Sequence, residues 1–175
     1  MKSKILLLLL FISIATTSQE IMTVKGDKQY KATPNWNFIS TNYSLTGEAQ
    51  VQIAKTENGG LLKLSVATTN PKFIISGTVY VYLSDNSFIS CSDKGLFENN
   101  DNALNSYFVF TTAEMSKLKK LNIESIRFNI KGTSDNFSSQ TGNFTAINKK
   151  SYYTSSYDNT RKIFETAQEL NKLYQ

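Results

Sequence analysis

Residues 49–69 read AQVQIAKTENGGLLKLSVATT, and this stretch predicts an antiparallel β-hairpin. Two apolar-alternating runs flank Asn58-Gly59, the dipeptide that two-residue hairpin turns prefer because both of its positions can adopt positive φ. A turn at this dipeptide fixes the register of the two strands. We therefore expect Val51 opposite Val66 and Ile53 opposite Leu64 on one apolar face.

The other face of this predicted hairpin is polar. The same register pairs Gln52 with Ser65 and Ala54 with Lys63. One apolar and one polar face are typical of an antiparallel pair that is buried on one side and meets water on the other.

A second hairpin is predicted within residues 79–95, VYVYLSDNSFISCSDKG. A two-residue turn at Asp85-Asn86 places Leu83 opposite Phe88 and Tyr80 opposite Cys91. Both faces of this ribbon are substantially apolar, which indicates a central position covered on both sides. Gly77, just ahead of it, predicts a bulge or a close approach of two backbone segments.

The rest of the chain alternates short strands with two helices. We expect strands within residues 30–39, 107–110, 123–130 and 144–148. Thr111 and Glu114 fit a capping box that begins a short helix. A C-terminal helix is predicted over about residues 158–174, with Asp158 as its N-cap and an apolar stripe of Ile163, Phe164, Ala167, Leu170 and Leu173.

These elements predict a mainly β fold: an antiparallel β-sandwich of about seven or eight strands with a short inserted helix and a C-terminal helix. The alternative is an up-and-down barrel that holds a small apolar ligand. One cysteine cannot form an internal disulfide, so the stability must come from packing.

Residues 1–18, MKSKILLLLLFISIATTS, have the three zones of a secretory signal peptide. Lys2 and Lys4 precede an apolar run that is about half as long as a membrane span requires. We expect cleavage after Ser18, a single domain over residues 19–175 without a membrane span, and a secreted or periplasmic protein. A lipid anchor would need a cysteine next to the cleavage site, and the only cysteine is Cys91.

The segments GTVYVYLSDNSFISCSDKG and SYFVFTTAEMSKLKKLNIESIRFNI, within residues 77–130, give the chain a resemblance to small secreted bacterial proteins of no assigned activity. The resemblance is one of pattern and covers about a third of the chain. It implies a β-rich domain, and it carries no catalytic motif.

The composition excludes several kinds of active site. The chain has no histidine, which removes histidine-activated nucleophiles and histidine-based zinc sites. Cys91 lies in a strand that is apolar on both faces, so we expect a buried and unreactive thiol. We expect no catalytic residues, no cofactor and no metal.

Residues 93–101, DKGLFENND, are the densest acidic stretch and predict either a solvated loop or a loop that binds calcium or a sugar. EF-hand spacing fails there, because Ala103 takes the sixth position counted from Glu98. The candidate ligand-binding residues are Trp36, Asp93, Glu98 and Asp101. Seven aromatic residues suit either sugar stacking or packing in a β protein: Trp36, Tyr43, Tyr80, Tyr82, Tyr107, Tyr152 and Tyr153.

The charge pattern argues against nucleic acid as a partner. Loss of residues 1–18 removes two lysines and no acid, which takes the formal net charge from +5 to +3. The remaining lysines occur in small groups, not along the dense basic face of a nucleic-acid-binding protein. We expect a non-enzymatic module that binds an extracytoplasmic glycan, cell-envelope component or protein. The alternatives are a carboxylate-dependent hydrolase and a lipocalin-like carrier.

Overall fold

The computed structural model describes residues 20–24, 28–40, 47–93, 95–100, 102–132, 138, 140–150 and 163–175. Several predictions lie outside these residues: the signal peptide over 1–18, Tyr43, Asp101, Tyr152, Tyr153 and the N-cap at Asp158. Within the described ranges, no helix has the length and apolar character that a membrane span requires.

The described residues form eleven strands and two helices. The strands are β1 (Glu20–Val24), β2 (Lys28–Ala32), β3 (Trp36–Ser40), β4 (Glu48–Thr56), β5 (Gly59–Ala67), β6 (Ile74–Ile75), β7 (Val79–Leu83), β8 (Phe88–Cys91), β9 (Ala103–Thr111), β10 (Ile123–Lys131) and β11 (Gly142–Ile147). The helices are α2 (Thr112–Leu118) and α3 (Thr166–Lys172).

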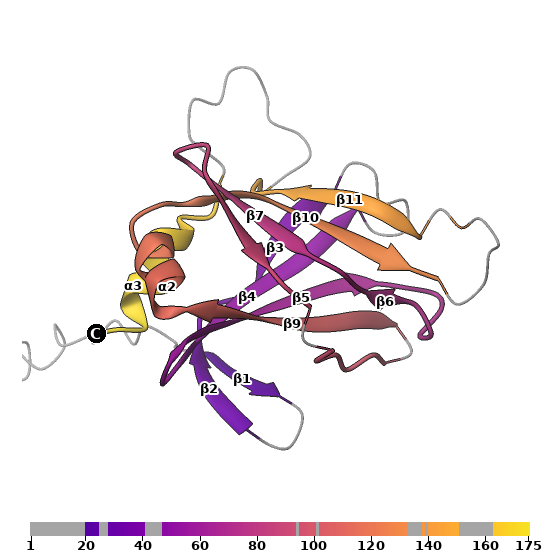
Figure 1. Ribbon diagram of the computed structural model, residues 1–175, viewed down its shortest axis with the longest axis horizontal. Coiled ribbons are helices and arrows are strands. Elements are labelled where there is room, and N and C mark those ends of the chain that lie inside the picture. The colour runs from indigo at the N-terminus through magenta and orange to yellow at the C-terminus, as the bar shows by residue number, and fades with distance from the viewer. Residues whose placement is uncertain are drawn as a thin grey trace, which may run out of the picture.

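All strands belong to one antiparallel sheet that curls into a half-barrel (Figure 1). From one edge to the other, the long path runs β9-β5-β4-β3-β11-β10-β7-β8. The predicted mainly β, antiparallel class is confirmed, but the structure has one curled sheet where we expected two packed sheets, and it has more strands. Alternating apolar residues fill a concave face as well as a sandwich interior, so the pattern alone does not separate the two arrangements.

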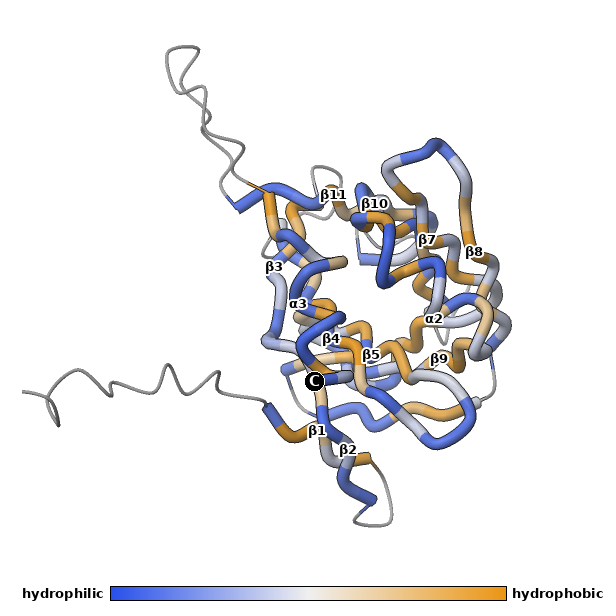
Figure 2. The backbone as a smooth tube through the Cα atoms, turned by 90° about the vertical axis from the view of Figure 1, so that its left-hand side faces the viewer, coloured by the Kyte–Doolittle hydropathy of each residue, from blue (hydrophilic) through white to orange (hydrophobic). Residues whose placement is uncertain are grey.

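The concave face of the sheet holds the main core. Its largest side chains include Trp36, Phe38, Phe108, Phe110 and Phe128, all nearly inaccessible to water. In Figure 2 the strands form a ring in this view, with α2 and α3 at the end that faces the viewer. Both helices contribute to the core, through Met115 and Leu118 of α2 and through Leu170 of α3.

The β4–β5 hairpin is confirmed, but its predicted register is wrong by two residues. Val51 pairs with Leu64, and Thr56 pairs with Gly59 across a turn formed by Glu57 and Asn58. A two-residue shift keeps every side chain on its predicted face. Gly59 is therefore not at the centre of the turn; it begins β5, where its backbone meets that of β9.

The outer face of β4 and β5 is partly covered, whereas the prediction was that it meets water: Gln52, Ala54 and Leu61 are buried, and Gln50 is exposed. Hairpin β1–β2 packs over it and forms a second apolar cluster of Met22, Ala32, Ala54, Leu61 and Tyr107. Gln52 is only 4% exposed, and its Nε2 donates to the Thr33 carbonyl oxygen (2.9 Å) and to Glu20 Oε2 (3.1 Å). The apolar partner of this face comes from a hairpin about 30 residues upstream, which local alternation does not reveal.

The β7–β8 hairpin is also present, with a register one residue away from the predicted one. Val79 pairs with Cys91, and Tyr82 with Phe88, because the connection has three residues ending at Asn86 with φ 63°. Such loops favour a left-handed residue at the third position. The shift puts Cys91 on the concave face and leaves Phe88 55% exposed on the outer face.

The β7–β8 hairpin is not central, since β8 ends the strand order. Tyr80 and Tyr82 are half-buried against Phe88 on the outer face, so Tyr80 does not shield Cys91.

Gly77 has φ 79° and no atom near its Cβ position, which supports a kink between β6 and β7 and rules out a close approach there.

Helix α2 begins as predicted, whereas the C-terminal helix α3 differs in length from its prediction. The capping box at the start of α2 is confirmed: Thr111 Oγ1 accepts from Glu114 N, and Glu114 Oε2 accepts from Thr111 N. The C-terminal helix is shorter than predicted, because residues 163–165 are not helical and α3 begins at Thr166. Trp36 and Phe38 lie in the predicted strand region and both belong to the main core on the concave face of β3.

Candidate functional site

The structure places the predicted ligand-binding residues apart from one another. Trp36 lies in the core and is 2% exposed. The Asp93 carboxylate accepts hydrogen bonds from the amides of Gly95 (2.7 Å) and Gly77 (3.3 Å), which shape the loop after β8. Asp101 lies outside the described residues. Among the residues that are described, no group of three or more acidic, cysteine or histidine side chains could hold a metal ion.

Glu98 lies beside strand β9 and binds within the protein. Tyr107 Oη donates to Glu98 Oε2 at 3.0 Å, and residues on either side of Glu98 pair with β9 through Tyr107 N and Leu96 O (2.9 Å). Burial, together with this hydrogen bond and the Glu98 charge, raises the pKa of Tyr107 to about 12. Residues 96–100 thus cover part of the β9 edge, where free backbone groups would otherwise face water.

Cys91 is buried on the concave face, as predicted. Burial, and secondarily the charge of Glu114, raises the pKa of its thiol to about 12. The nucleophilic form of cysteine is the thiolate, which is scarce at neutral pH when the pKa is this high.

A cleft lies instead at the end of the sheet that carries the helices. Three adjoining pockets, of about 430, 480 and 100 Å³, share Thr56 and Glu57 of the β4–β5 turn. Strand β2 forms one wall, and the C-terminal residues after α3 form another. We call this combined hollow the turn cleft.

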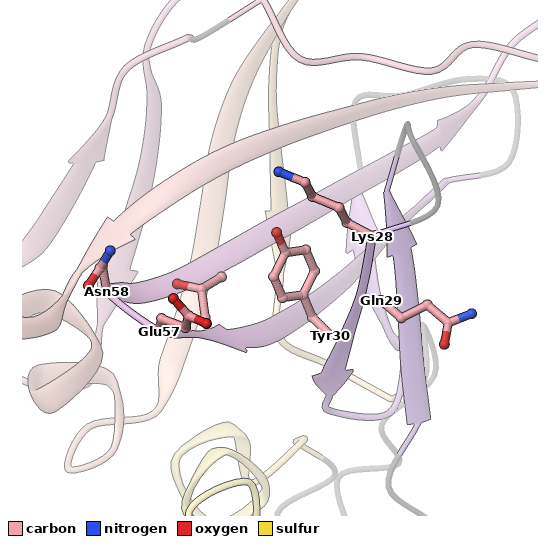
Figure 3. Close-up of a pocket in the computed structure, with 6 residues that line it drawn as sticks. Lys28, Gln29, Tyr30, Glu57 and Asn58 are labelled. Carbon is pink, nitrogen blue, oxygen red and sulfur yellow. The ribbon is translucent and has the colours of Figure 1, made fainter.

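Strand β2 directs alternate side chains to its two sides. Lys28 and Tyr30 point toward Glu57 and Asn58, whereas Gln29 points the opposite way (Figure 3). Tyr30 is half-buried because part of its ring packs against the second apolar cluster. Its position is therefore fixed by packing.

Tyr174 forms the opposite wall and is flanked by two cations. The Nζ atoms of Lys119 and Lys55 lie 4.1 and 4.4 Å from its ring centroid. An ammonium group at this distance is attracted by the ring's quadrupole. Partial burial raises the pKa of the Tyr174 hydroxyl. Two positive charges are thereby held beside one aromatic ring.

The side chains around the turn cleft carry an excess of positive charge. Among the described residues, four lysines line it, namely Lys28, Lys31, Lys55 and Lys119, against one glutamate side chain, Glu57. None of the four lysines forms an ion pair with another described residue. Two of them, Lys55 and Lys119, contact the Tyr174 ring instead.

Helix α3 positions the Tyr174 wall through a network of asparagine hydrogen bonds. Asn148 donates to the carbonyl oxygens of Ile123 (2.7 Å) and Phe164 (2.9 Å) and accepts from Phe164 N (2.8 Å). Asn122 Oδ1 accepts from Ala167 N at 2.9 Å, and Asn171 Nδ2 donates to Lys119 O at 2.7 Å. The same network therefore fixes α3 and joins it to the end of α2.

Comparison with known proteins gives no relatives to guide the interpretation: neither the protein-family models, nor the curated proteins, nor the solved structures include a match to this chain. The chemistry of the turn cleft therefore has to be argued from its own residues.

The turn cleft offers binding groups: two aromatic rings, four ammonium groups, and the carboxylate and amide of Glu57 and Asn58. Sequence reasoning missed it because Tyr30 and Tyr174 lie at opposite ends of the chain. The usable signal was limited to the grouping of lysines near tyrosine in KQYK, residues 28–31.

Proposed function

We propose that the protein is a secreted, non-enzymatic binding module that holds a glycan in the turn cleft. The observation that carries this proposal is the lining of the cleft, where tyrosine rings lie beside lysine, glutamate and asparagine side chains. Sugar rings present apolar faces that stack on aromatic side chains, and their hydroxyl groups need hydrogen-bond donors and acceptors. Tyr30 and Tyr174 supply the first, and Glu57 and Asn58 the second.

The two alternatives receive less support from the described residues. Glycoside hydrolysis needs two carboxyl groups about 5–10 Å apart on either side of the bond. Glu57 is the one carboxylate side chain among the described residues of the turn cleft, and a separate pocket beside β5 and β9 has Glu48. A carrier of an apolar ligand needs interior space, and the concave face is occupied by the side chains of the main core.

Export is part of the proposal. Strand β1 begins at Glu20, two residues after the expected cleavage at Ser18, so cleavage would leave the whole hairpin β1–β2 in place. The intact mass of exported protein tests this: we expect a chain that begins at Gln19. A mass that still includes residues 1–18 would contradict it.

The binding proposal is tested by screening residues 19–175 on a glycan array. The ligands bound by the wild type are then titrated with Tyr30→Ala and with the control Tyr80→Ala. Tyr80 is a half-buried tyrosine of the same kind on the outer face of β7, away from the cleft. Stacking is worth about 0.5–1.5 kcal/mol, so Tyr30→Ala should weaken binding several-fold. An array with no bound glycan, or equal losses in both variants, would refute the proposal.

A further inference from the structure

We infer that the ligand of the turn cleft is an acidic polysaccharide, whose carboxylate groups pair with the lysines of the cleft. The inference rests on the proposed function and adds the charge of the ligand to it. It follows from the arrangement of cations and rings around Tyr30 and Tyr174.

The described side chains that line the turn cleft carry more positive than negative charge. Lys55 and Lys119 both place their Nζ atoms within 4.4 Å of one ring centroid, although like charges repel. Lys31 lines the same pocket as Lys55, and Glu57 is the one acidic side chain among the described residues that line it. An incoming anion would relieve this repulsion, whereas a neutral ligand would leave it unchanged.

The positive charges are spread along the turn cleft. Lys28 lines the first pocket, Lys31 and Lys55 the second, and Lys119 the third. The three pockets adjoin along the β4–β5 turn, so the lysines are spread along the cleft and are not gathered at one point. A linear polymer with a charge on successive units matches this arrangement better than a single small anion does.

The residues that line the cleft favour a polysaccharide over a nucleic acid. Both offer ring faces and regularly spaced anions. However, the described arginine, Arg127, is exposed on β10 and is not among the lining residues of the cleft. The Glu57 carboxylate can accept hydrogen bonds from the hydroxyl groups that a sugar polymer carries on its rings. These features favour the sugar polymer.

The experiment uses residues 19–175 and matched pairs of polymers. The probes are polygalacturonate, alginate and hyaluronate, each compared with its carboxyl-reduced form, and single-stranded oligothymidylate. Affinity is measured by calorimetry at low and at physiological ionic strength. The test variant is Lys55→Gln/Lys119→Gln, and the control is Lys72→Gln/Lys131→Gln, which removes two exposed lysines elsewhere. Circular dichroism melts check that both variants are folded.

We expect at least one acidic polymer to bind, and its carboxyl-reduced form to bind about ten-fold more weakly, since each exposed ion pair contributes modestly. The cleft variant should lose a similar factor and most of the salt dependence, while the control keeps wild-type affinity. Equal binding of acidic and reduced polymers, with no effect of the cleft variant, would overturn this inference but leave the proposed function standing. Tighter binding of oligothymidylate would overturn it in favour of nucleic acid. Failure of all polymers, together with an empty glycan array, would overturn the proposed function itself.

Discussion

The backbone around Gly59 leaves no room for a side chain at this position. Its φ is 146°, and a Cβ atom there would lie 2.1 Å from the Phe110 carbonyl oxygen of the neighbouring strand. Gly77 also has positive φ, at 79°, but nothing lies within 4 Å of its Cβ position. The two glycines therefore separate the cost of backbone strain from the cost of a collision.

We predict that Gly59→Ala lowers the free energy of unfolding by more than roughly 3 kcal/mol, because strain and collision combine. Gly77→Ala should cost roughly 1 kcal/mol, from strain alone. Urea unfolding of both variants measures the difference. Equal midpoints would show that strand β9 moves aside at no cost.

Gln52 is buried and hydrogen-bonded, although its place on the polar face of the hairpin suggests a side chain that meets water. Replacement by valine removes the donor to the buried Thr33 carbonyl oxygen and to Glu20. We predict that Gln52→Val lowers the free energy of unfolding by about 1–3 kcal/mol, because a buried acceptor loses its partner. Gln29→Val, at an exposed position of β2, should stay within about 0.5 kcal/mol. Indistinguishable urea midpoints would mean that water enters and satisfies Thr33.

Cys91 should behave as a packing residue. We predict slow reaction with a thiol reagent in the native protein and fast reaction in denaturant, since the thiol is buried and its pKa is about 12. Cys91→Ala should cost roughly 1–2 kcal/mol of stability and leave ligand binding unchanged. Rapid labelling of folded protein would contradict the buried position.

Helix α3 is the element whose attachment is most polar. We predict that Asn148→Ala lowers the free energy of unfolding by roughly 2–4 kcal/mol, because three backbone groups of Ile123 and Phe164 lose their partner. Asn143→Ala is the control: Asn143 is exposed on β11, where its Oδ1 accepts one exposed hydrogen bond from Asn129, so its replacement should change the free energy by about 0.5 kcal/mol or less. Because α3 carries Tyr174, Asn148→Ala should also weaken ligand binding, and intact affinity in a destabilised variant would show that the C-terminal wall is not needed.

At the level of these elements, sequence reasoning succeeds where the signal is local. The capping box of Thr111 and Glu114, the strand around Trp36 and the alternation over 123–130 all describe contacts within a few residues. Both hairpins were also found, but their registers were not. Register depends on which residues form the turn: β7–β8 has a three-residue loop ending at Asn86, and in β4–β5 Gly59 lies in the strand, against the backbone of Phe110, and not in the turn.

The candidate site was beyond the reach of the same reasoning. Tyr30 and Tyr174 are brought together by the path of the sheet and by the docking of α3, neither of which has a local pattern. In contrast, the acidic stretch 93–101 is conspicuous in the sequence, yet Asp93 and Glu98 form hydrogen bonds within the fold.

For the molecule as a whole, the raised pKa values of one thiol and one tyrosine hydroxyl predict that the free energy of unfolding falls at alkaline pH. The folded-state pKa values of Cys91 and Tyr107 are both raised to about 12, from ordinary values of 9.0 and 10.0. Their contribution is fully present below about pH 9 and is lost as the pH rises toward 12, since the unfolded chain releases these protons first. We predict a falling free energy of unfolding over this range. A double variant, Cys91→Ala with Tyr107→Phe, should show a shallower fall, and an unchanged slope would assign the effect to other groups.

Hairpin β1–β2 is joined to the rest of the sheet along one short stretch, by hydrogen bonds of Thr33 with β4 and of Gln52 with Glu20. Its ladder to β4 is a single pair, Ala32 with Ala54, supported by the small cluster around Met22 and Tyr107. Regions with few attachments open without global unfolding, so the amides of β1 and β2 should exchange with deuterium well before those of β5. Since β2 is also a wall of the turn cleft, part of any ligand's binding energy would be spent on closing this hairpin. Occupancy of the cleft would then be visible as slower exchange at the N-terminus, even if no atom of the sheet moved.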